Sequence, residues 1–263
     1  MPDFAIIFAG FAVGLTVGLT GVGGGSLMTP ILIFFFGVKP YLAVGTDLLF
    51  AAFTKLGGTV SLASQRLVPW RVVSQLSAGS LPAALITLAV LHQLGPASER
   101  VQGLMTHTLG VALLLTAAAM LFKAVRGKQL PRHLAADEIA QASRARHPWI
   151  VVVFGAVIGA LVTLTSVGAG AIGVSVLLLL FPLLPLPRIV AADIDYAVPL
   201  TLVAGLGHAS LGSVDWPLLA KLLAGSLPGI WLGTRLMRHT PERLVRSLLS
   251  LLLAYAGTKL IVL

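Results

Sequence analysis

The stretch LTGVGGGSLMTP, residues 19–30, places four glycines within five residues between two strongly apolar segments. Glycine is flexible and a poor helix former, so a cluster of glycines tends to separate helices. A similar string, SVGAG, occupies residues 166–170. The two strings predict non-helical turns in the middle of apolar sequence, and the rest of the chain indicates where such turns lie.

The composition is typical of a membrane protein. Of the 263 residues, 57% are hydrophobic and only 10% are charged, whereas soluble domains carry about 25% charged residues. A bundle of membrane helices accommodates so much apolar surface without exposing it to water. The net charge of +9 is explained by cationic cytoplasmic loops rather than by nucleic-acid binding. The chain has no cysteine, which excludes disulfides and thiolate metal sites.

Ten apolar segments are separated into two sets of five by one polar stretch. The first set covers about residues 4–19, 26–37, 41–64, 70–92 and 98–122, and the second about 149–165, 170–184, 188–211, 217–237 and 241–262. The polar stretch carries six Lys or Arg residues and two acids. We therefore expect an all-α polytopic membrane protein with an N-terminal transmembrane repeat (1–122), a basic cytoplasmic linker (123–148) and a C-terminal transmembrane repeat (149–263).

The two halves resemble each other in sequence. GVGGG (21–25) aligns with SVGAG (166–170), and AVGTDL (43–48) aligns with AADIDY (191–196), which pairs Asp47 with Asp195. VPW (68–70) aligns with VDW (214–216), and AGSLP occurs at 78–82 and again at 224–228. Four matches in the same order indicate an internal duplication, which is common in transporters.

The charges favour halves of opposite orientation. The second segment of each half is only about twelve residues, roughly 18 Å of helix against a 30 Å hydrocarbon core. If each short first pair enters and leaves on one side, three spans remain per half and the second half is inverted. Thirteen cations then lie inside and four outside, as the positive-inside rule requires, whereas eight spans with parallel halves give at best ten against seven. Whether the short pairs are re-entrant or spanning stays open.

Each glycine turn suggests an anion site. Irregular backbone at membrane depth occurs only where it is buried in protein or lines a cavity. A helix that begins there directs free N–H groups and partial positive charge inwards. The alternative is that the glycines only allow close helix packing. The candidate substrate-binding residues are Gly21, Gly23, Gly24, Gly25, Ser26, Thr46, Lys55, Ser166, Gly168 and Gly170.

Several strings are similar to one family of transporters. They are GVGGGSLMTPIL (21–32), AVGTDL and GHASLGSVDWPLLAKLLAGSLPGIWLGTRL (207–236). In these motifs the sequence resembles the TauE/SafE sulfite exporter family. The resemblance implies an integral membrane transporter of sulfite, sulfonates and related organosulfur anions, driven by an ion gradient. SVGAG has fewer glycines than the family pattern, and AADIDY has an acid where the family usually has a small or hydroxyl residue.

Ionisable residues within apolar segments are candidate coupling groups. Asp47 and Asp195 are assigned to coupling, with a helix N-cap as the alternative; the neighbouring Asp193 is a weaker candidate. Lys55 is either a counter-charge for the anion or the partner of Asp47 in an ion pair. His208 is a candidate proton carrier, with a packed histidine as the alternative.

The sequence thus predicts a secondary transporter in the cell membrane that exports sulfite or small organosulfonates and is coupled to H⁺ or Na⁺. An uncoupled anion channel is the alternative. An enzyme is disfavoured, because the chain has no metal-ligand spacing and no nucleotide motif. No cofactor and no nucleic acid are expected, the lipid bilayer is the surrounding partner, and a homodimer remains open.

Overall fold

A computed structural model describes residues 3–20, 25–64, 66–125, 143, 148–236 and 242–262. Within these ranges every regular element is a helix, which confirms the all-α prediction. The first half contains α1 (Asp3–Thr20), α2 (Gly25–Phe34), α3 (Pro40–Ser64), α4 (Trp70–Leu94) and α5 (Glu99–Val125). The second half contains α7 (Pro148–Thr165), α8 (Ala171–Leu180), α9 (Leu186–Ser210), α10 (Trp216–Leu236) and α11 (Glu242–Val262). The predicted segments agree with these helices to within a few residues.

The helices have the length and surface of membrane spans. Among the described residues four helical stretches are long and apolar enough to cross a bilayer: α4, residues 99–121 of α5, α7 and α9. Large apolar side chains also point outwards, such as Ile86 on α4 and Leu251 on α11, each 65% exposed. Outward apolar surface of this kind is stable in lipid and not in water. The chain is a multi-pass membrane protein.

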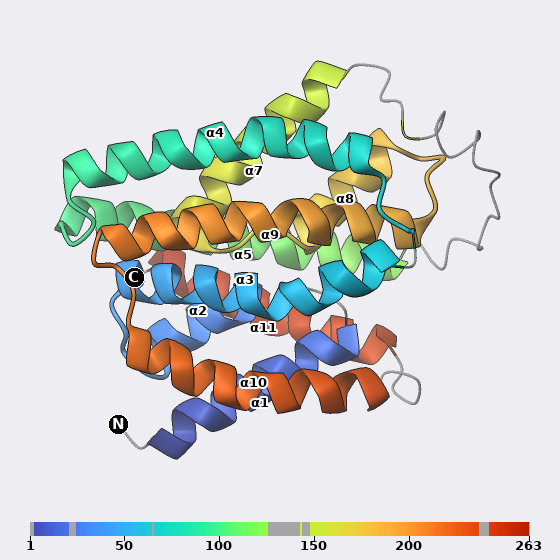
Figure 1. The fold of residues 1–263 in the computed structure, drawn as a ribbon. Coiled ribbons are helices and arrows are strands. Elements are labelled where there is room, and N and C mark those ends of the chain that lie inside the picture. Colours follow the sequence, from blue (N-terminus) through green and yellow to red (C-terminus); the bar gives the residue numbers. More distant parts are fainter. Residues whose placement is uncertain are drawn as a thin grey trace.

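Each half packs mainly against the other half. Helix α1 packs along α10, and α4 packs along α7, so the first helix of each half lies on the fourth helix of the other. The third helices, α3 and α9, pack on each other, as do α5 and α11. In Figure 1, α4 lies at the top of the bundle and α1 with α10 at the bottom, while α3 and α9 occupy the middle. The two central helices therefore lie where residues from both halves meet.

Glycines set the close approach of the outer pairs. On α10, Gly225, Gly229 and Gly233 follow one another at four-residue spacing along one face. A Cβ at Gly229 would overlap the Phe11 carbonyl oxygen of α1. The α4–α7 pair is built in the same way, with Gly155 and Gly159 against the backbone of α4. Small residues let helix backbones approach in lipid, where hydrophobic attraction between helices is weak.

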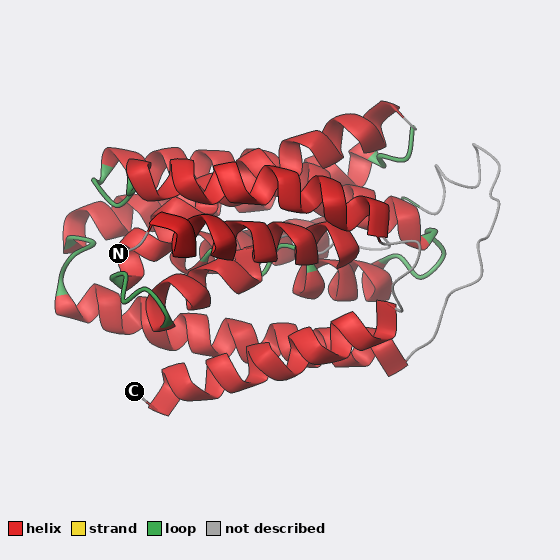
Figure 2. Ribbon diagram, turned by 90° about the horizontal axis from the view of Figure 1, so that it is seen from below, coloured by secondary structure: helices red, strands yellow, loops and turns green. Residues whose placement is uncertain are grey.

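The second helix of each half is short, as predicted. Helices α2 and α8 have ten residues each, which corresponds to about 15 Å, half the thickness of a hydrocarbon core. Helix α2 packs on α3, and α8 packs on α9. Figure 2 shows the helical bundle from below, with most of the connecting loops at its left and right ends. Each short helix therefore begins inside the protein and beside a central helix.

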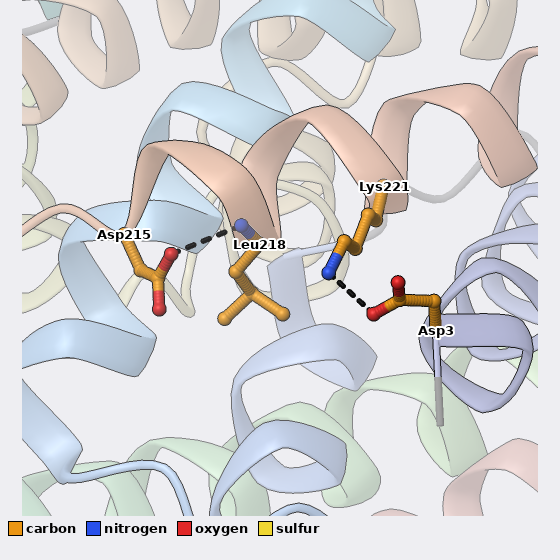
Figure 3. A network of polar contacts seen from close by, with 4 residues as sticks. All are labelled: Asp3, Asp215, Leu218 and Lys221. Atoms are coloured by element: carbon orange, nitrogen blue, oxygen red, sulfur yellow. Dashed lines mark hydrogen bonds and ion pairs between the residues drawn. The ribbon is translucent and has the colours of Figure 1, made fainter. Parts of the chain in front are cut away.

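The start of α10 is fixed by polar contacts away from the centre. The Asp215 carboxylate accepts the Leu218 N–H at 3.0 Å and so caps the helix. Lys221, one turn further on, forms an ion pair with Asp3 of α1 at 2.5 Å. Figure 3 shows both contacts on one side of α10. They attach the start of α1 to α10, in addition to the glycine contacts between the two helices.

Candidate functional site

Asp47 is the acidic residue of helix α3. Its side chain is fully buried, and its Oδ2 accepts a hydrogen bond from the Thr29 hydroxyl of α2. The Ser166 side chain, from the turn between α7 and α8, faces the same carboxylate. Asp47 Oδ1 and Ser166 Oγ are both buried and have no hydrogen-bond partner among the described residues. The structure thus brings a glycine-rich turn of the second half against an acid of the first.

Lys55 lies two turns beyond Asp47 on the same helix and is 7% exposed. Its ammonium group interacts electrostatically with two buried carboxylates, Asp193 of α9 and Asp47. The described residues include no direct salt bridge between Lys55 and either acid. Lys55 is therefore a buried cation shared by two acids rather than the partner of Asp47 alone. A buried charge without a close partner is unfavourable, so this arrangement is suited to a ligand that changes the local charge.

Asp193 and Tyr196 of α9 face the first turn of α8. A Cβ at Gly173, the third residue of α8, would overlap Oδ1 of Asp193 and would lie 3.2 Å from the Tyr196 hydroxyl oxygen. Asp193 is 2% exposed and Tyr196 is fully buried. Only a glycine at this position lets the two polar groups approach the start of the helix so closely.

The turn before α8 has an unusual backbone. Ser166, Gly168 and Gly170 all have positive φ, at 61°, 131° and 127°. Ser166 is strained there because non-glycine residues rarely adopt positive φ. The Gly170 carbonyl accepts the Val174 N–H at 2.9 Å, which starts α8. The predicted turn is thus present, and it ends in a helix N-terminus inside the protein.

The matching turn of the first half is described only at its end. Gly21, Gly23 and Gly24 lie outside the described residues. Gly25 is the first residue of α2 and Ser26 the second. The prediction that this turn holds an anion therefore stays a prediction.

Two further predicted residues have clear structural partners. The Thr46 hydroxyl accepts the Asp215 N–H at 3.0 Å, at the start of α10. His208 is fully buried, and its Nε2 lies 2.9 Å from the Thr163 carbonyl, to which it donates. Its Nδ1 has no partner among the described residues. The geometry gives both residues a role in joining helices, alongside the proposed roles in binding and coupling.

Asp195 stands apart from the other acids. It is 5% exposed, and its polar neighbour is Thr59 on α3. Neither carboxylate oxygen has a hydrogen-bond partner in the described part of the chain.

The helix bounds give a second internal alignment of the two halves. Asp47 lies seven residues after Pro40, the start of α3, and Asp193 lies seven residues after Leu186, the start of α9. Counted from the helix starts, Asp193 corresponds to Asp47, whereas the alignment of the AVGTDL and AADIDY strings pairs Asp47 with Asp195.

The sequence reasoning missed Thr29, Gly173 and Tyr196, and it gave Asp193 too little weight. The predicted segment starts, about 41 and 188, place Asp47 opposite Ile194, so only the helix bounds of the structure pair Asp47 with Asp193. No signal in a single sequence identified Thr29 or Tyr196, because a threonine or tyrosine in an apolar segment is unremarkable by itself.

Comparison with known proteins identifies the family. The sequence profile of the sulfite exporter TauE/SafE family matches residues 6–260. The chain belongs to the TauE/SafE sulfite exporter family. This TauE/SafE protein is 35% identical over 257 residues to the probable membrane transporter protein YjnA of Bacillus subtilis strain 168, with 98% of this chain and 99% of YjnA covered. It is 27% identical to the probable membrane transporter protein YunE of the same strain, with 99% and 98% covered.

A third similar protein from that strain, the probable membrane transporter protein YdhB, is 24% identical, with 97% of this chain and 99% of YdhB covered. No solved structure matches the TauE/SafE chain. The predicted family resemblance is confirmed, and the protein is a membrane transporter and not an enzyme.

Proposed function

We propose that this transporter exports sulfite or small organosulfonate anions, and that the anion binds between the residue 21–26 turn and the Ser166–Gly170 turn. The observation that carries the proposal is the contact between Ser166 and Asp47. It joins an inward-facing helix N-terminus of one half to a buried acid of the other, with the Ser166 hydroxyl facing the carboxylate. Helix N-termini bind anions through preorganised N–H groups.

The buried charges support coupling to a cation gradient. Asp47, Asp193 and Asp195 are all at most 5% exposed, and Lys55 is the cation that interacts with the first two. Transferring an anion into such a site is unfavourable unless a positive charge accompanies it. We propose that Asp47 and Asp195 take up the coupling ion, H⁺ or Na⁺, and that His208 assists. The same burial disfavours an open channel, whose binding groups would contact water.

We also propose that residues 1–122 and 149–263 form an inverted repeat whose linker, 123–148, is cytoplasmic. The reciprocal pairing of α1 with α10 and of α4 with α7 supports this arrangement. In Figure 1, α3 runs from left to right and α9 from right to left. The end of α3, the starts of α4 and α9 and the end of α10 lie on the right. The cations next to those ends, with the six of the linker, fit the positive-inside rule.

Flux measurements in proteoliposomes test the function. The purified protein is reconstituted, and uptake of radiolabelled sulfite, methanesulfonate and sulfate is measured with imposed pH or Na⁺ gradients and without them. We expect accumulation above equilibrium for at least one sulfur oxyanion and only under one of the gradients. Flux that follows the anion gradient alone would favour the channel. Absence of flux for all sulfur oxyanions, while another anion crosses, would contradict the substrate class. Empty liposomes and the variant Asp215→Asn, outside the site, are the controls.

A further inference from the structure

The start of α8 is already faced by an acid. Helix α8 begins at Ala171 after a turn of positive-φ residues. The Gly173 and Val174 N–H groups donate to the Gly168 and Gly170 carbonyls, which leaves the first two N–H groups of the helix as donors for a ligand. The Asp193 carboxylate of α9 lies against Gly173 in this first turn. A carboxylate and a substrate anion would compete for the same positive end of the helix.

A second group in the same place points to a ligand. The Tyr196 hydroxyl is fully buried, lies against the same glycine as Asp193, and has no hydrogen-bond partner within the described ranges. Buried hydroxyl groups are nearly always hydrogen-bonded, so an unpartnered one indicates a missing partner. A small oxyanion has the acceptor oxygens that this hydroxyl group lacks.

The charged groups described around Asp193 come from α3 and α9. Lys55 on α3 interacts electrostatically with both Asp193 and Asp47. Asp195 and Tyr196 are its titratable neighbours on α9. Helices α7 and α8 carry no titratable side chain, and Arg71 and His92 of α4 are exposed. Lys55 therefore interacts with two acids. A bound anion would be a third negative charge, and no further cation is described for it.

We propose that Asp193 is the residue whose protonation admits the anion to the start of α8. This proposal rests on the proposed function, takes its coupling ion to be the proton, and adds Asp193 to the acids proposed for coupling: Asp193 takes up the proton that accompanies anion binding. In the empty site the ionised carboxylate competes with substrate for the helix start. When a proton from water binds a carboxylate oxygen, Asp193 becomes neutral and donates a hydrogen bond instead. The anion then binds at the N-terminus with the Asp193 and Tyr196 hydroxyls as donors and with Lys55 nearby.

The test is the proton count of binding. Purified transporter in weakly buffered detergent solution is titrated with methanesulfonate or sulfate while a pH indicator reports proton uptake. These anions stay ionised near neutral pH, whereas sulfite itself exchanges protons there. We expect uptake of about one proton per bound anion, and affinity that weakens as the pH rises, by up to ~10-fold per pH unit. Binding without proton uptake, at an affinity independent of pH, would overturn the proposal.

Variants assign the proton to its residue. Asp193→Asn keeps the shape and stays neutral, so it should bind the anion without proton uptake and with a flat pH dependence. Asp193→Ser serves the same purpose if the asparagine variant does not fold. Tyr196→Phe should weaken binding roughly tenfold and keep the proton uptake, because only a donor is lost. Asp215→Asn should behave like the unmodified protein.

Two outcomes distinguish a failure of the role of Asp193 from a failure of the proposed transport function. If the anion binds and both Asp193 variants still take up a proton, another acid is the proton site and the role of Asp193 is wrong, while the transport function stands. If the folded protein binds none of the sulfur oxyanions, the proposed function and the role of Asp193 both fail.

Discussion

At the scale of single residues, the candidate site contains a few charged side chains, all of them buried. Asp47 is bonded to Thr29 and faces Ser166, Asp193 faces the start of α8, and Lys55 interacts with both acids. Changing one charge without another leaves an uncompensated buried ion, which is strongly unfavourable. Neutral isosteres of the acids are therefore the informative substitutions.

Asp47→Asn should abolish accumulation of anion above equilibrium and preserve binding. The asparagine can still accept the Thr29 hydrogen bond, so the fold is retained, but it cannot carry a coupling cation. Accumulation and binding are measured in parallel, in proteoliposomes and in detergent, with Asp215→Asn as the control. Normal gradient-driven accumulation by Asp47→Asn would show that this acid is structural.

Gly170→Ala should weaken anion binding, whereas Gly212→Ala should affect stability alone. Both glycines have positive φ, at 127° and 68°, so an alanine is strained at either position by about 1–3 kcal/mol. Only Gly170 precedes a helix start in the candidate site, and Gly212 lies in the α9–α10 loop. If the protein relieves this strain by moving the turn, the helix start is no longer in place for the anion. A loss of this size weakens binding about tenfold or more. The measurement is affinity for methanesulfonate in folded protein, with thermal stability followed alongside; equal loss in both variants would contradict the role of the turn.

At the scale of elements, the glycine-lined contacts between halves hold the bundle together. Because lipid and side chains are equally apolar, helix association depends on close packing and on buried polar contacts. The α1–α10 and α4–α7 pairs have such packing, with backbone directly against glycine. The central α3–α9 pair carries the buried acids and Lys55 in addition to a close glycine contact between Gly205 and Leu49.

Gly229→Ala should destabilise the protein, and Gly103→Ala should not. A methyl group at Gly229 overlaps the Phe11 carbonyl, whereas nothing lies within 4 Å of the corresponding position at Gly103 on α5. Overpacking of this kind costs about 1–3 kcal/mol, while alanine in a helix is favoured over glycine by up to about 1 kcal/mol. Thermal unfolding in detergent should show a lowered midpoint for Gly229→Ala and an unchanged or raised one for Gly103→Ala. A similar midpoint for both variants would mean that the α1–α10 contact does not limit stability.

At the scale of the whole molecule, the two halves form one structure and not two domains. Each long outer helix finds its main partner in the other half, so neither half buries its glycine faces alone. The candidate site depends on the same exchange, since Ser166 of the second half faces Asp47 of the first. The orientation of the halves in the membrane is then a property that labelling can test.

Single cysteines placed in this cysteine-free chain should report the inverted arrangement. Ala97→Cys and Gly212→Cys, in exposed loops, should react with a membrane-impermeant maleimide added outside the cell. Leu67→Cys and Leu236→Cys should react only after the membrane is permeabilised. The reason is the cation bias, which assigns the ends near residues 67 and 236 to the cytoplasm. Labelling of residues 67 and 236 from opposite sides would contradict inverted halves.

Much of the fold was predictable because its rules are local. Helix lengths follow from apolar runs, and glycine clusters or prolines end them, so the ten described helices, including the two short ones, were anticipated. Asp47, Lys55 and the Ser166–Gly170 turn were also recognisable, because charges and glycines in apolar sequence are rare. The sequence by itself determined the membrane class, the element order and the residues that are costly to bury.

Only the tertiary structure decided which of these residues meet. In lipid every face of a helix is apolar, so periodicity does not indicate which face contacts a neighbour. The exchange of partners between halves, which places Ser166 beside Asp47, therefore left no trace in sequence spacing. The same is true of Asp193 and Tyr196, which reach the start of α8 only because Gly173 packs against α9. The sequence predicts Thr46 for anion binding and His208 for coupling, and the contacts that these residues make with Asp215 and Thr163 depend on chain segments far away in the sequence.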